Sequence, residues 1–165
     1  MNCTGQCDTC NVDHSVESAN RGHGISYSDK VKEYVNKVEY LNKDNNFNQI
    51  LVENNKDIFS GKWGSPACGD IVELYVRLDT DKNTILDAKY LSTGCWGSIS
   101  SSCLGCEYII NKKLFDINTT DLTKYIMQEL KLPKIKLHCS VFVGQCLDQI
   151  KQKISMNPQE NKCSI

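Results

Sequence analysis

Three cysteines of the chain lie beside residues that are typical of turns or of helix starts. Their strings are SPACGD around Cys68, GCWG around Cys95, and HC ending at Cys139. A helix N-terminus favours the thiolate, which is the form of cysteine that binds metal and attacks sulfur. Turns and helix starts at the ends of neighbouring elements can also face one pocket. The spacing therefore predicts a shared metal- or sulfur-handling site.

Two further residues widen the set of ligands that such a site would offer. Asp70 adds a carboxylate and His138 adds an imidazole. Iron–sulfur clusters are held mainly by Cys thiolates, with His as an attested substitute, and Zn(II) accepts the same ligands in tetrahedral geometry. Because the set exceeds what one ion needs, the site could exchange ligands while a cluster is built or released.

The hydrophobic pattern predicts the elements that must position these residues. A period of 3.6 residues predicts four helices, at 27–41, 98–113, 121–130 (with Asp121 or Thr120 as N-cap) and 138–154. A period of two predicts an antiparallel hairpin of strands at 71–78 and 84–92. Residues 42–64 are expected to form a loop, with a short strand at 49–53. The expected fold class is α/β (α+β), a small antiparallel sheet with helices 98–113 and 138–154 packed on one face.

The three cysteine strings resemble the signature regions of the U-type iron–sulfur cluster assembly scaffolds, the IscU and NifU N-terminal domain type. SPACGD, the Gly-Cys turn followed by SISSSCLGCEY, and LPKIKLHCSV occur in the family's order and spacing over residues 60–155. The resemblance implies that Cys68, Cys95 and Cys139 hold a nascent cluster, with Asp70 and His138 assisting binding and release.

The same resemblance implies the cargo and the partners. The cargo would be a [2Fe-2S] or a [4Fe-4S] cluster, and Zn(II) could occupy the site when no cluster is bound. Sulfur would come from a pyridoxal-phosphate cysteine desulfurase, and the clusters would pass to apo iron–sulfur proteins. The protein would be a carrier without turnover of its own.

Two regions depart from the family pattern. The first helix of the family usually ends in Asn-Pro-Arg-Asn, where this chain has NKVEYLNKDNN. The family's Leu-Pro-Pro-Val-Lys loop, which recruits an Hsp70-type chaperone, reads Leu-Pro-Lys-Ile-Lys at 132–136. Recruitment of that chaperone is therefore left open.

The ten cysteines of the chain include further candidate thiols. Three of them, Cys103, Cys106 and Cys146, fall on the apolar stripes of predicted helices, which favours core packing over metal binding. Near the N-terminus, Cys3, Cys7 and Cys10 have the spacing that radical-SAM enzymes use for a [4Fe-4S] cluster. A tail that accepts a metal and a tail that binds nothing stand as equal alternatives.

Two other functions compete with the scaffold. The first is a zinc-bound sulfur acceptor that activates a cysteine desulfurase, which is the role of a sister branch of this fold. Members of that branch generally lack the His before the third Cys and have a longer insertion ahead of that Cys. His138 and the compact gap between Cys95 and Cys139 favour the scaffold. A structural zinc protein would need neither Asp70 nor surplus thiols near the site.

Composition sets the remaining expectations. The chain has 165 residues, is 24% charged and carries a net charge of −1, so it has no electrostatic footprint for nucleic acid. No apolar run approaches the roughly 18 residues of a membrane span. The N-terminus has neither a signal nor a transit pattern, which favours a cytoplasmic protein whose thiols stay reduced. We expect a Cys-containing tail at 1–24, a scaffold domain at 25–155, a C-terminal tail at 156–165, and a monomer or dimer.

Overall fold

The computed structural model describes residues 25–42, 57–79 and 83–156. The elements, with η for 3-10 helices, are α1 (Asp29–Asn36), β1 (Ile58–Ser65), β2 (Asp70–Asp79), β3 (Thr84–Thr93), α3 (Trp96–Ile109), η1 (Leu114–Asp116), α4 (Thr119–Leu130), η2 (Lys134–Val141) and α5 (Phe142–Met156). The N-terminal tail, the strand expected at 49–53 and residues 157–165 lie outside the described part. Met156, the first residue of the expected C-terminal tail, is the last residue of α5.

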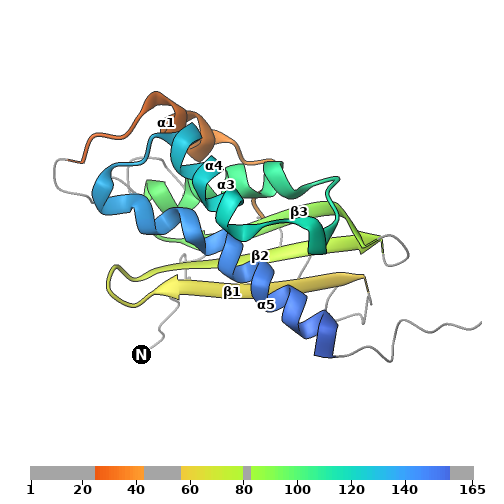
Figure 1. The fold of residues 1–165 in the computed structure, drawn as a ribbon. Helices are drawn as coiled ribbons and strands as arrows, with labels where there is room; N and C mark the ends of the chain where they lie inside the picture. Colours follow the sequence, from red (N-terminus) through yellow and green to blue (C-terminus); the bar gives the residue numbers. More distant parts are fainter. Residues whose placement is uncertain (1–24, 43–56, 80–82, 157–165) are drawn as a thin grey trace, which may run out of the picture.

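The three strands form one antiparallel sheet in chain order, β1-β2-β3 (Figure 1). The predicted hairpin of β2 and β3 is confirmed. The even-numbered residues of β2 from 72 to 78 point into the main core, while its odd-numbered residues lie on the opposite face. On that opposite face Tyr75 packs with Ile58 and Leu91 in a small separate cluster.

The prediction of a loop over 42–64 is wrong for residues 58–64, which belong to β1. The string IFSGKWGS has two glycines and no clean alternation, so its strand character comes from pairing with β2 and from α5. Lys62 N–H donates to the side chain of Gln149 (3.0 Å), and the Lys153 ammonium donates to the Ser60 carbonyl (2.6 Å). Side chains of α5 thus bind backbone groups on the outer edge of β1. In a free edge strand these N–H and carbonyl groups would have no partner.

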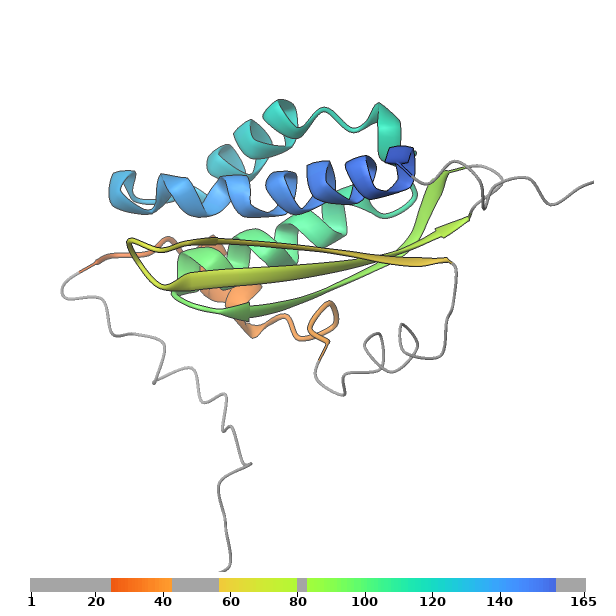
Figure 2. The ribbon, with the colours of Figure 1, turned by 90° about the horizontal axis from the view of Figure 1, so that it is seen from below.

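The predicted packing of two helices on one face of the sheet is confirmed. Core residues of α3 and α5 join those of β2 and β3 in a single cluster, and α4 lies on the same side as α5 (Figure 2). The fully buried members include Leu104 and Ile109 from α3 and Leu147 and Ile150 from α5. No helix of the described residues is long and apolar enough to cross a bilayer.

The first helix is shorter than its periodicity predicts. α1 ends at Asn36, and the backbone around Tyr40 then runs along β3 instead of continuing as a helix. Tyr90 N–H donates to the Tyr40 carbonyl (2.8 Å), and Asn42 N–H donates to the Tyr90 carbonyl (2.9 Å). Bonding to the exposed edge of β3 therefore replaces the last turn of the expected helix.

The other helices also differ from prediction at their ends. α4 begins at Thr119, and its N-cap is Asn118, whose side chain accepts from the backbone of residues 120 and 121, so the predicted caps at those two positions are wrong. α3 stops at Ile109, before the left-handed Asn111. The last helix begins at Phe142 instead of residue 138, because the segment after Pro133 forms the tighter η2.

Candidate metal centre

Three segments that are far apart in the sequence supply the candidate ligands. Cys68 lies in the turn between β1 and β2, and Asp70 is the first residue of β2. Cys95 is the N-cap of α3, which begins two residues before the predicted start at residue 98. The sequence predicted that His138 and Cys139 begin the last α-helix. They lie instead inside η2, just before α5. The three segments meet at one end of the sheet.

The inner part of the site consists of Asp70, Cys95 and Cys139, and a metal could bind between them. The Cys95 sulfur lies 3.8 Å from the Cys139 sulfur and 3.2 Å from Oδ2 of Asp70, which is itself 3.8 Å from the Cys139 sulfur. Two thiolates bound to one tetrahedral zinc at about 2.3 Å also stand about 3.8 Å apart. The pair is thus spaced as ligands of one metal would be.

A backbone contact fixes the carboxylate in this position. The amide N–H of Cys95 donates to Oδ1 of Asp70 (3.1 Å), and the carboxylate is only 4% exposed. A Cβ at Gly94 would lie 2.6 Å from Oδ1, so glycine leaves the space that the carboxylate occupies. The end of β3 and the start of α3 therefore position Asp70 against the two thiols.

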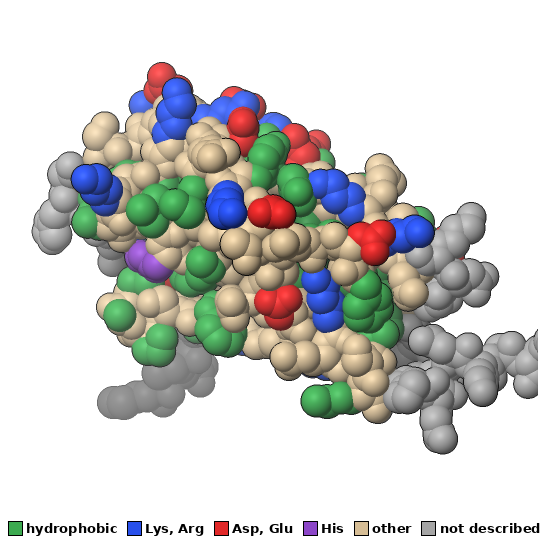
Figure 3. All heavy atoms as spheres, in the orientation of Figure 1, with side chains coloured by type: hydrophobic (Ala, Val, Ile, Leu, Met, Phe, Trp, Pro, Cys, Tyr) green, Lys and Arg blue, Asp and Glu red, His purple; other side chains and the backbone are tan. Residues whose placement is uncertain are grey.

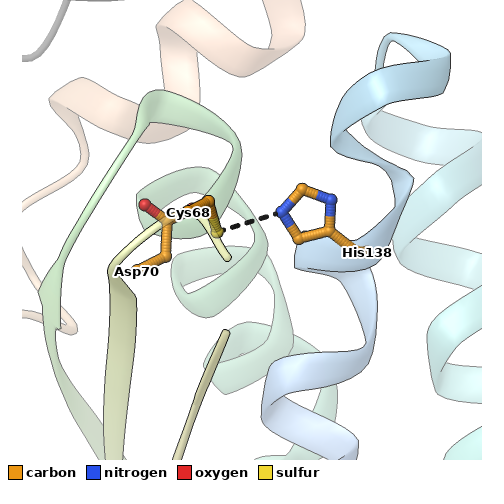
Figure 4. A group of neighbouring side chains, drawn as sticks. All are labelled: Cys68, Asp70 and His138. Carbon is orange, nitrogen blue, oxygen red and sulfur yellow. Dashed lines mark hydrogen bonds between the residues drawn. The ribbon is translucent and has the colours of Figure 1, made fainter. Parts of the chain in front are cut away.

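The outer part of the site consists of Cys68 and His138, together with the same Asp70. The Cys68 sulfur faces Nε2 of His138 at 3.4 Å (Figure 4), and the Cys139 sulfur is 3.6 Å from the same nitrogen. Cys68 is exposed, while the histidine is half-buried, with its ring edge toward Phe142. The structure thus brings all five predicted residues together, as two overlapping groups that share Asp70.

Proton sharing distinguishes the two inner thiols. A hydrogen bond with Cys139 lowers the pKa of Cys95 to about 6. The same hydrogen bond, burial and the nearby charges of Cys95 and Asp70 raise the pKa of Cys139. Of the two inner thiols, Cys95 is therefore the one whose thiolate form is favoured.

Two residues at the site were not predicted from the sequence. Burial, and then the neighbouring Cys95, raise the pKa of Tyr27. Although burial alone would lower the pKa of Lys136, its interactions with Cys95 and Asp70 raise it, so the ammonium stays charged beside the thiols. No local pattern indicates either residue, because tertiary packing brings Tyr27 to the site and the tight turn of η2 brings Lys136.

The remaining described thiols belong to the core. Cys103, Cys106 and Cys146 are fully buried, and none joins a possible metal group within the described residues. Burial raises the pKa of Cys103 and of Cys146 to about 12, and that of Cys106 well above its usual value. These three are core thiols, as favoured from the sequence, while Cys3, Cys7 and Cys10 lie outside the described residues.

The three-stranded antiparallel sheet with helices on one face, and a site of thiols, carboxylate and imidazole at its end, define a small α+β protein with a candidate metal centre at one end. The family model of the NifU-like N terminal domain matches residues 27–164, and the chain belongs to this family.

Individual relatives agree with this assignment. The iron-sulfur cluster assembly scaffold protein IscU of Azotobacter vinelandii is 34% identical over 123 residues, which cover 74% of this chain and 89% of that protein. Iron-sulfur cluster assembly protein 1 of Arabidopsis thaliana is 36% identical over 95 residues, or 58% of this chain. The match spans 56% of the length of the Arabidopsis protein.

A solved structure has a similar fold. It is a candidate iron-sulfur cluster assembly scaffold protein for the SUF system from Fervidobacterium islandicum, with a TM-score of 0.57 at 20% sequence identity. The likeness covers 75% of this chain and 95% of that one, and it supports the predicted fold class.

Proposed function

We propose that the chain is a scaffold on which iron–sulfur clusters are assembled and from which they pass to apo-proteins. The observation that carries the proposal is the convergence of three thiols from separate segments around one carboxylate and one imidazole. Relatives named as assembly scaffolds support it, as does the family membership. The proposed ligands are Cys68, Asp70, Cys95, His138 and Cys139.

Each part of the site suits one stage of the task. Cys68 is exposed, so its sulfur can be reached by a large donor such as a cysteine desulfurase, the proposed source of sulfur. The lowered pKa of Cys95 favours its thiolate, which is the form that binds iron. Asp70 is a hard and weaker partner for iron than a thiolate, so its bond to the cluster is the easiest to exchange. A [2Fe-2S] cluster is the first cargo we propose, with [4Fe-4S] as the alternative.

The remaining partners follow from accessible surfaces. Ile135, in the middle of the loop that resembles the family's chaperone-recruiting segment, is 64% exposed, which supports binding of an Hsp70-type chaperone there. On the face drawn in Figure 3, basic and acidic side chains are interspersed over the helices, an arrangement that does not favour nucleic acid. The cytoplasmic location, the domain boundaries and the monomeric or dimeric state stay predictions.

A zinc-bound sulfur acceptor that activates a desulfurase is the second candidate, because the inner thiols are spaced for one tetrahedral zinc. The two functions differ in what the site accumulates. A scaffold gains iron and acid-labile sulfide together, whereas a sulfur acceptor keeps zinc and stimulates the desulfurase without gaining sulfide.

The test is anaerobic reconstitution of the full chain with a desulfurase, cysteine and ferrous iron, followed by visible absorption and by iron, sulfide and zinc analysis. We expect stoichiometric iron and sulfide on the parent protein and almost none on Cys139→Ser. Cys146→Ser is the matched control, because that thiol is equally buried but lies against the Val72 carbonyl, away from the site. Zinc retention without sulfide would favour the sulfur acceptor instead.

A further inference from the structure

The candidate site is open on one side and closed on the other. Cys68 is exposed and His138 is half-buried, so solvent reaches this pair. Cys139 is fully buried, and Cys95 is half-buried although it stands at the tip of a helix, where side chains are often exposed. Some other side chain must therefore cover Cys95.

Two aromatic residues contribute to this cover, together with the Lys136 ammonium already described. Trp96 directly follows Cys95 as the first residue of α3, and its ring lies 5.7 Å from the ring of Tyr27, with the two planes tilted by 39°. The Tyr27 hydroxyl interacts with the Cys95 thiol and with the backbone of Gly97. Tyr27 thus lies against Cys95 and also packs on Trp96, the residue that follows Cys95.

Tyr27 is held in this place by its neighbour in the chain. The Ser28 hydroxyl caps α1 by accepting from Val31 N–H (3.2 Å), and it donates to the carbonyl of Leu130 at the end of α4 (2.5 Å). The position of the Tyr27 ring is therefore fixed by two helices, so the contact with Trp96 is part of the tertiary structure.

The environment of Trp96 is not the one that packing alone favours. Its indole Nε1 is buried and has no hydrogen-bond partner among the described residues. An unpaired buried donor reduces stability, and an apolar ring of similar size would avoid that loss. Departures of this kind from the best packing are typical of functional sites.

We propose that Tyr27 and Trp96 form an aromatic wall that closes the Cys95 side of the site, so that metal or cluster is exchanged only from the side of Cys68 and His138. The inference deepens the proposed function and rests on it for the nature of the cargo. An incoming thiolate first replaces Cys68 or His138. The incoming thiol becomes this thiolate by giving its proton to the departing side chain or to solvent. Each new iron–thiolate bond forms as one bond from the scaffold to the same iron breaks, and no electron is transferred. The bonds to Cys95 and Cys139 break last.

A single bound ion tests the wall without requiring cluster assembly. The full chain is loaded anaerobically with one equivalent of Co(II), and the site signal is the part of the thiolate charge-transfer band that Cys139→Ser abolishes. EDTA then extracts the ion, and the loss of the band is timed. We expect extraction to be about fivefold faster in Trp96→Ala and Tyr27→Ala, the scale of one aromatic contact. Trp96→Phe should resemble the parent protein.

The matched control is another tilted aromatic pair, Tyr108 of α3 and Tyr125 of α4, whose rings lie 4.7 Å apart at the same interplanar angle of 39°. EDTA should extract Co(II) from Tyr125→Ala at the same rate as from the parent protein. Equal rates in Trp96→Ala and the parent would overturn the wall and leave the scaffold assignment standing. Absence of a Cys139-dependent band in the parent would instead contradict the proposed function, and the wall with it.

A second measurement needs no metal. Iodoacetamide alkylation of the metal-free proteins, mapped by peptide mass, should be faster at Cys95 in Trp96→Ala while the rate at Cys68 is unchanged. Cys146, which is fully buried, is the internal reference: a variant that only loosens the fold would also expose Cys146 to alkylation and would count against the wall.

Discussion

At the scale of single residues, Asp70 determines what kind of site the proposed ligands would make for a metal. It belongs to both ligand groups, and the Cys95 amide holds it in place at 3.1 Å. A fourth thiolate at this position would give a closed set of soft ligands, as in proteins that keep their clusters. A carboxylate there makes one bond to iron weaker than the others.

Replacement of Asp70 by alanine should therefore leave assembly possible but slow the release of the cluster. We expect Asp70→Ala to transfer its cluster to an apo-ferredoxin about tenfold more slowly, equivalent to about 1.4 kcal/mol in the barrier. Asp79→Ala, at the other end of the same strand, is the control. Equal transfer rates from Asp70→Ala and the parent protein would remove the release role and leave the scaffold role intact.

The buried thiols should differ from the site thiols in reactivity. Because burial raises the pKa of Cys103 and Cys146 to about 12, both stay neutral at pH 8, and the neutral thiol is a poor nucleophile. Iodoacetamide at pH 8 should label Cys68 and Cys95 in the metal-free folded protein and should spare Cys103, Cys106 and Cys146. Peptide mass mapping checks this, with complete labelling in denaturant as the control. Rapid labelling of Cys103 in the folded chain would contradict its place in the core.

The sequence predicted which residues come together at the candidate site but not what surrounds them. Cys68, Cys95 and Cys139 could be selected because each stands in a recognisable string at a junction between elements. Tyr27 could not, because it reaches Cys95 only through the docking of α1 on the end of α4. Contacts between segments far apart in the chain leave no local pattern.

At the scale of elements, the strands with period two were predicted well and β1 was not. The long apolar alternation of β2 determines which face is buried, and it can be read without any knowledge of partners, whereas the register of β3 shifts opposite Arg77 and Leu78. β1 depends instead on the close approach of α5, where a Cβ at Gly61 would overlap the carbonyl of Cys146. The end of α1 and the start of α5 were missed for a similar reason. Bonding to the edge of β3 replaces the last turn of the first helix, and η2 after Pro133 delays the start of the last one.

Gly61→Ala should therefore destabilise the protein, because the overlapping atom belongs to helix backbone and cannot rotate away. We expect a loss of about 1–3 kcal/mol in the free energy of unfolding, measured by urea denaturation. Gly144→Ala is the matched control: it lies in α5, its nearest contact would be the Thr119 side chain at 3.3 Å, and alanine is the better helix former. A Gly61→Ala protein as stable as the Gly144→Ala protein would contradict the packing of β1 on α5.

At the scale of the whole molecule, the candidate site joins parts of the fold that are otherwise held together mainly by the core. Its ligands come from the turn before β2, the start of α3 and the segment η2. A metal bound to all three would link them directly, whereas the unfolded chain presents the same ligands without fixed geometry. Binding is then linked to folding.

Zinc should consequently raise the melting temperature of the full chain, and the increase should depend on the site. A ligand present at 100 times its dissociation constant and bound only by the folded state stabilises that state by about 2.7 kcal/mol. We expect thermal unfolding, followed by far-UV circular dichroism, to shift upward by several degrees with one equivalent of Zn(II), and EDTA to reverse the shift. Cys139→Ser should lose the shift, whereas Cys146→Ser should keep it even if its baseline stability is lower. An unchanged shift in Cys139→Ser would mean that the stabilising zinc binds other thiols, and the placement of the metal between Cys95 and Cys139 would then be wrong.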